Sequence, residues 1–288
     1  MQPAGKQNGQ RIEATMDTTN RQFETRREDA RTLFPRLAKP LVDEVLGHRL
    51  HDDASAEEFH KLRVALRRIR TLLWAWRPLL DRDAIERERA FLRRVAAAAG
   101  EARDWDIAMT LLDANAELAD GRIDAARRKA RESAKNTLSA ADLKHTLPEM
   151  LHNVKTGLNT GQASVPARRF ARKRVLAARQ ALGKRIRRAR KAGKGEYTAW
   201  HDVRKGAKKV RYLLEFFAPM APHGYKGKLK GLKKLQKKFG DLNDAVATEH
   251  LLSEHRELFK DEATSQAVLS RLHKESRRRL RAAAKLVG

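Results

Sequence analysis

One stretch of the sequence, HDVRKGAKKVRYLLEFF (201–217), combines a histidine with cations at a regular spacing. His201 is followed by Arg204, Lys208 and Arg211, and on a helix these four side chains fall within an arc of about 80°. Guanidinium and ammonium groups bind phosphate oxygens, and a charged imidazole would add a further donor. The spacing therefore indicates a face that could hold a phosphate-like anion.

The same pattern occurs 141 residues earlier, where His60, Arg63, Arg67 and Arg70 hold the equivalent positions. On the helical wheel this stripe borders the apolar face directly. The alternative is a solvated charged surface, in which Arg and Lys stems cover the edge of the core. A solvated surface does not require the same four basic positions in both copies, and few carboxylates are available to pair with these residues. The repeat therefore favours anion binding.

A second block follows each copy, in which a glycine precedes an aspartate by four residues. These are Gly100 with Asp104 and Gly240 with Asp244, at an offset of 140. Two ordered blocks at nearly one offset predict two homologous halves, each a small helical bundle. The glycines suggest a helix break followed by a new start. We expect the aspartates to have a structural role, orienting neighbouring basic side chains.

The elements that must position these residues are all helical, because apolar residues recur with helical period and no long period-two segment exists. Asp53 or Ser55 is expected to cap the second helix, and Pro78 and Pro219 to end helices at equivalent places. Residues 1–20 are expected to be disordered. Helices are predicted over residues 21–50, 55–77, 82–99, 102–118, 121–139, 142–156, 166–191, 196–218, 226–239, 242–256 and 261–286. The main break, 157–166, divides the chain into a first half (21–160) and a second half (161–288), which together form one domain.

Composition limits the classes of function. The chain has 63 Lys or Arg against 36 Asp or Glu, a formal charge of +27, which attracts polyanions. Residues 161–288 carry about +23 of it. The absence of cysteine excludes disulfides and thiolate sites. No apolar run is long enough to span a membrane and no signal peptide is apparent, so a cytoplasmic location is expected.

The candidate binding residues extend beyond the two stripes. A further basic stripe follows residues 225–239 and has no full counterpart in the first half. The second half is therefore expected to contribute more cations than the first to a shared anion-binding groove. No metal is expected, since nothing sets a ligand spacing. His60 and His201 either bind the anion or hydrogen-bond to a neighbouring helix. The full predicted set is His60, Arg63, Arg67, Arg68, Arg70, Arg93, His201, Arg204, Lys205, Lys208, Lys209, Arg211, Lys230, Lys233, Lys234 and Lys237.

The repeated pattern H-x-x-R-x-x-x-[RK]-[RK]-x-R, with a G-x-x-[RN]-D block after each copy, resembles the CHAD family (conserved histidine α-helical domain) over about residues 20–288. This resemblance implies an all-α fold of two pseudosymmetric antiparallel bundles around a basic central groove that binds inorganic polyphosphate, without catalysis or a cofactor. A stand-alone form is expected because no E-x-E-x-K motif is found. Asn243 stands where an arginine is expected, and several second-half positions are Lys.

The sequence favours a non-catalytic polyphosphate-binding module, which could target polyphosphate granules. The alternative is a nonspecific nucleic-acid-binding protein, although the 4 Trp, 3 Tyr and 9 Phe lie mostly in apolar contexts and provide no evident stacking platform. A phosphate-metabolising enzyme with His60 or His201 as acid–base is disfavoured, since no carboxylate or metal accompanies the stripe.

Overall fold

The computed structural model describes residues 28–48, 55–112, 121–160, 164–193, 196–220 and 225–287, and within these ranges the chain is helical without a strand. The predicted all-α class is confirmed. The helices are α2 (Ala30–Gly47), α3 (Ala56–Trp76), α4 (Arg82–Leu111), α6 (Arg122–Ala140), α7 (Leu143–Thr160), α8 (Ala167–Ala192), α9 (Tyr197–Phe216), α10 (Tyr225–Glu254) and α11 (Glu262–Ala284), with 3₁₀ turns η1 (Arg77–Leu79), η2 (Ala218–Met220) and η3 (Arg256–Leu258). None of the described helices is both long and apolar enough to cross a membrane.

Local chemistry fixes several helix ends as predicted. Ser55 caps α3 in a capping box: its hydroxyl accepts from the amide of Glu58, and its own amide donates to the Glu58 carboxylate at 2.6 Å. Pro78 and Pro219 lie in the 3₁₀ turns that follow α3 and α9, since proline lacks a backbone donor and disfavours a helix interior. That cost is not decisive everywhere, because α2 contains Pro35 and Pro40 and α7 contains Pro148. Asp53, the other candidate cap, lies outside the described residues.

The predicted helix breaks at Gly100 and Gly240 are wrong. Both glycines lie inside continuous helices of 30 residues, α4 and α10. A glycine costs a helix interior only about 1 kcal/mol relative to alanine, and tertiary packing along a long helix outweighs that cost. The expected first helix, 21–50, is shorter in the structure, because α2 begins at Ala30 and ends at Gly47. Residues 21–27, 49–50 and 113–118, also expected to be helical, lie outside the described residues.

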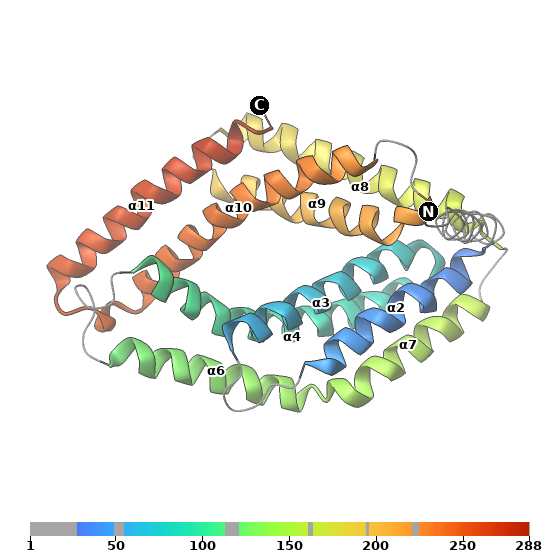
Figure 1. The fold of residues 1–288 in the computed structure, drawn as a ribbon, viewed down its shortest axis with the longest axis horizontal. Coiled ribbons are helices and arrows are strands. Elements are labelled where there is room, and N and C mark those ends of the chain that lie inside the picture. The colour runs from blue at the N-terminus through green and yellow to red at the C-terminus, as the bar shows by residue number, and fades with distance from the viewer. Residues whose placement is uncertain are drawn as a thin grey trace, which may run out of the picture.

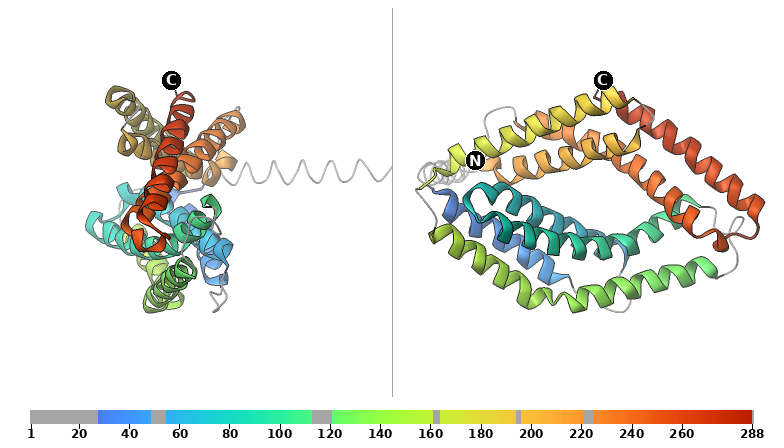
Figure 2. Two further views of the ribbon diagram at one scale, coloured as in Figure 1. Left: turned by 90° about the vertical axis from the view of Figure 1, so that its left-hand side faces the viewer. Right: turned by 180° about the vertical axis from the view of Figure 1, so that it is seen from behind.

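Two long helix pairs form the centre of the molecule (Figure 1). Helix α3 packs on α4 and α9 packs on α10, and the pairs meet where α3 contacts α9 and α4 contacts α10. Around them, α2 packs on α3 with α7 outside it, and α8 packs on α9. Helices α6 and α11 extend along α4 and α10 to the far end, as the two further views show (Figure 2).

One core cluster contains residues from both 28–160 and 164–287. Trp76 is fully buried at its centre, and its indole N–H donates to the carbonyl of Ala30 at 2.8 Å. Its ring packs against Phe34, Phe170 and Phe217, with centroids 5.4, 4.7 and 5.9 Å away. A single indole thus joins α2, α3, α8 and the end of α9, and this packing holds α3 against α9.

Candidate anion-binding site

Four basic side chains converge where α3 and α9 meet, and we call them the central cluster. Its members are Arg63 and Arg67 from α3, and Arg204 and Lys208 from α9. They interact across the two helices, since the charges of Arg63 and Arg67 act on both Arg204 and Lys208. All four residues are half-buried. The cluster is therefore part of the packed meeting point of the helices.

The central cluster gathers like charges with little solvent around them. Burial, reinforced by Arg67 and Arg204, lowers the pKa of Lys208 to about 5. Burial and Arg67 together lower the pKa of Arg204 to about 10. Both effects disfavour the charged form. At neutral pH Lys208 is therefore uncharged in the free protein, and an approaching anion would favour its protonation.

Two carboxylates lie among these cations. Arg63 forms an ion pair with Asp104 over 3.6 Å, and the charge of Asp244 favours the charged forms of Arg204 and Lys208. Burial raises the pKa of Asp104, while Arg63 lowers it and Asp244 raises it. The two aspartates therefore lie within electrostatic reach of each other, and three arginines and Lys208 meet two carboxylates at this place.

A hydrogen-bond network on the α9 side was not apparent from the sequence. Arg204 Nη1 and the hydroxyl of Tyr197 both donate to Asn243 Oδ1, at 2.9 and 3.1 Å. Because the hydroxyl proton is used there, Nδ1 of His201 donates to the Tyr197 oxygen at 3.1 Å. Burial and Lys205 lower the pKa of His201 to about 4, so this imidazole is neutral at pH 7. Tyr197 lies four residues before His201 on the same stripe, which is the pattern that could have revealed it.

Gly100 has a role that helical spacing alone does not indicate. A Cβ atom at this position would lie 2.8 Å from Cζ of Arg63, whereas a Cβ at Gly240 would meet nothing within 4 Å. The missing side chain thus lets the Arg63 guanidinium lie against α4, next to Asp104. The two glycines, equivalent in the sequence repeat, have different surroundings in the structure.

This difference predicts unequal effects on stability. Gly240→Ala should raise the free energy of unfolding by about 0.5–1 kcal/mol, because alanine is the better helix former. Gly100→Ala should give a smaller gain or none, since the Arg63 guanidinium must leave its position against α4. Chemical denaturation of both variants measures the difference. Equal gains would show that Arg63 does not depend on Gly100.

Further cations extend from the central cluster along α3 and α4. Burial, Arg93, Arg89 and Arg67 together lower the pKa of Arg70 to about 10, so Arg70 lies within electrostatic reach of Arg67 in the central cluster and of two arginines on α4. Arg93 is exposed and Arg89 half-buried. Arg89 is already paired with Glu86 at 2.6 Å, so Arg70 and Arg93 are the basic side chains that extend the positive charge from the central cluster to α4.

Lys209 lies elsewhere than predicted. Lys209 belongs to the predicted binding set, but its Nζ lies 4.2 Å from the ring centroid of Trp74, which Arg174 Cζ also approaches at 4.2 Å. Burial lowers the pKa of Lys209 to about 8, with Arg185 as the next cause. The reason is that α8 covers this side of α9. Lys209 thus faces α3, α4 and α8, and not the central cluster.

Among the remaining predicted residues, Arg211 acts on the central cluster, because burial and then neighbouring charges, including that of Arg211, lower the pKa of Arg67. His60 is half-buried on α3. Three are paired with acids: Arg68 with Glu44 at 3.4 Å, Lys205 with Asp202 at 3.8 Å and Arg211 with Glu215 at 3.4 Å. Four are exposed along α10: Lys230, Lys233, Lys234 and Lys237.

The fold and the central cluster define an all-helical protein that gathers cations where two helix pairs meet. The CHAD domain model matches residues 36–253, and the chain belongs to this family. The fold is similar to the crystal structure of the CHAD domain from the plant Ricinus communis, with a TM-score of 0.72 and 20% identity, covering 90% of this chain and 92% of that one. It is also similar to PptA from Streptomyces chartreusis, with a TM-score of 0.63 and 19% identity, covering 90% and 98%. No curated protein matches the sequence.

Proposed function

We propose that the chain is a non-catalytic binding module for inorganic polyphosphate. The observation that carries the proposal is the central cluster: three half-buried arginines and the amine of Lys208, from two helices, meet only two carboxylates. Like charges in such a site oppose one another, and a bound polyanion relieves that opposition. Membership of the CHAD family supports the same conclusion. Binding to long chains would allow the protein to associate with polyphosphate granules.

The shape of the ligand follows from the placement of the cations. The side chains of the central cluster are half-buried between helices, so a thin, flexible chain of phosphates can reach them more easily than a rigid duplex. Arg70, with Arg93 within its electrostatic reach on α4, extends the site beyond the central cluster, which suits a linear polyanion. Arginine forks would bind phosphate oxygens in pairs, and Lys208 would bind as a point charge.

A nucleic-acid ligand has less support. Trp76, Trp105 and Trp200 are buried in the core, and the ring of Trp74 is already in contact with Arg174 and Lys209. None of the four tryptophans therefore offers a free face for a stacked base. The net charge of +27 still favours weak, sequence-independent attraction to DNA.

Competition between ligands tests the proposal. We expect the full chain to bind fluorescently labelled long-chain polyphosphate, and unlabelled polyphosphate to displace it at a lower phosphate concentration than duplex DNA does. Affinity should fall steeply between two salt concentrations, because each cation contact releases counterions. Tripolyphosphate should compete less well than the long chain, since it reaches fewer cations. Equal displacement by DNA at equal phosphate concentration would overturn the proposal in favour of nonspecific nucleic-acid binding.

A further inference from the structure

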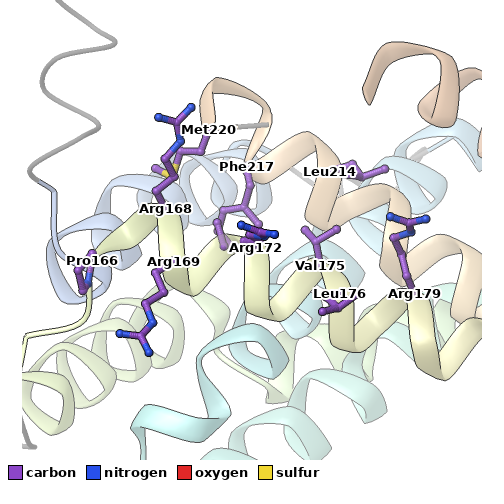
Figure 3. Close-up of a pocket in the computed structure, with 11 residues that line it drawn as sticks. Pro166, Arg168, Arg169, Arg172, Val175, Leu176, Arg179, Leu214, Phe217 and Met220 are labelled. Carbon is purple, nitrogen blue, oxygen red and sulfur yellow. The ribbon is translucent and has the colours of Figure 1, made fainter. Parts of the chain in front are cut away.

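A groove follows the outer side of α8, away from the central cluster (Figure 3). It has a volume of about 890 Å³ and lies between α8 and the end of α9 with its following turn. Apolar side chains form its floor, among them Leu214 and Phe217, which are buried, and Val175. Leu176 also lines it and is 50% exposed, more than any other large hydrophobic residue in the described part of the chain. An apolar surface of this kind commonly marks a docking site.

Comparison with α2 shows what kind of element the groove lacks. Counted from the first residue of each helix, Ala30 and Ala167, the residues Ala38 and Val42 of α2 correspond to Val175 and Arg179 of α8. Ala38 and Val42 are buried, whereas Val175 is half-buried and Arg179 is exposed. Helix α2 packs against α7 as well as α3, but no described helix covers this side of α8. The groove thus occupies a place that a helix covers on α2.

The element that covers α2 indicates what could fill the groove. Helix α7 buries Leu147, Met150, Val154 and Leu158, an apolar stripe at intervals of three and four residues, as in an amphipathic helix. On α8 the groove extends from Arg168 to Arg179, about 16 Å along the helix axis. Three turns of an amphipathic helix have this length, which corresponds to helix-in-groove recognition.

The charged residues around the groove indicate the charge that a partner should carry. Helix α8 has no Asp or Glu over its 26 residues, and Arg168, Arg172 and Arg179 line the groove without an ion pair to another described residue. Residues 1–27 of this chain carry five Lys or Arg against three Asp or Glu, so they do not complement this rim. Polyphosphate would match the arginines but has no apolar groups for the floor. A flat membrane surface would reach Leu176 but not the recessed Leu214.

We propose that this groove binds an acidic amphipathic helix of a partner protein. Its apolar stripe would cover Val175, Leu176 and Phe217, in the way that α7 covers α2. Its carboxylates would pair with Arg172 and Arg179, where bidentate geometry is available. Polyphosphate and the partner would then occupy different surfaces of one domain, so the protein could link a protein partner to a polyanion.

A designed peptide tests this proposal with the full chain. The probe is a fluorescently labelled, 18-residue helical peptide with leucines at the spacing of the α7 stripe and glutamates at most other positions, followed by anisotropy. We expect saturable binding that Leu176→Glu weakens at least tenfold, and the double variant Arg172→Glu with Arg179→Glu as much. Leu46→Glu, which changes a leucine that is 37% exposed on α2, is the control for the first variant. Arg188→Glu with Lys191→Glu, both exposed on α8 outside the groove, controls for charge.

Three outcomes would overturn the proposal. One is equal binding of a scrambled peptide of the same composition, which would show attraction by charge alone. Another is wild-type affinity in the Leu176→Glu variant. The third is absence of peptide binding together with Leu176-dependent binding to anionic phosphatidylglycerol vesicles, which would assign the groove to membranes. A variant with alanine at Arg67 and Arg204 should bind the peptide like the wild type, so failure of the polyphosphate proposal leaves this result unaffected.

Discussion

Replacing Arg67 and Arg204 together with alanine is expected to weaken binding of long-chain polyphosphate by about 10²–10⁴-fold. Each truncation removes a charge-assisted contact worth about 1.5–3 kcal/mol, and 1.4 kcal/mol corresponds to a factor of ten. Arg67 should matter most, because its charge acts on Arg70, Arg204 and Lys208 alike. Anisotropy or calorimetric titration of the double variant at fixed salt measures the loss.

A charge-matched variant separates the site from the overall field of the protein. Arg128 on α6 and Arg188 on α8 are exposed, and alanine at both removes the same net charge. We expect this control to weaken binding by only a few-fold, since exposed charges are screened within a Debye length. If the two double variants lost affinity equally, the +27 charge, and not the central cluster, would hold the polyanion.

Lowering the pH from 8.0 to 6.5 is expected to strengthen polyphosphate binding by up to about 30-fold. In the free protein, burial among cations lowers the pKa of Lys208 to about 5, so the amine is neutral over this range. A bound polyanion holds it in the charged form, and binding takes up one proton. Uptake of one proton changes the affinity by about tenfold per pH unit, with tighter binding at lower pH. Calorimetry in buffers of different ionisation enthalpy counts the protons directly.

The free protein should respond to pH with the opposite sign. Since the pKa of Lys208 is lower when folded than the value of about 10.4 expected for an unfolded chain, the unfolded state binds the extra proton. This contribution therefore makes the native state more stable as the pH rises from about 5, the pKa of Lys208 in the folded protein, to about 10.4, its pKa in the unfolded chain. Lys208→Met should abolish the Lys208 part of the proton uptake and stabilise the free protein, because an apolar group of similar size replaces a poorly solvated amine. Lys205→Met, at an exposed residue nearby, is the matched control, and an unchanged proton count in Lys208→Met would contradict the assignment.

Local sequence patterns predicted much of the fold. The capping box at Ser55 depends on contacts within one turn of the chain, so it can be found without tertiary structure. Proline is a weaker guide, because Pro78 and Pro219 follow helix ends whereas Pro35, Pro40 and Pro148 lie inside helices. The breaks predicted at Gly100 and Gly240 failed for the opposite reason. A glycine's small local penalty decides a helix end only if tertiary packing does not outweigh it.

Helical spacing determines the direction of a side chain about its own helix axis, and for that reason the sequence by itself determined the two basic stripes and their position beside the apolar face. It does not determine which neighbouring helix lies opposite each direction. Only the tertiary structure placed Lys208 among Arg63, Arg67 and Arg204, and the adjacent Lys209 against Trp74. The partition into two pseudosymmetric halves stays a prediction. The network through Tyr197 and Asn243, the contact of Arg63 with Gly100, and the uncovered side of α8 were likewise decided by packing between segments far apart in the chain.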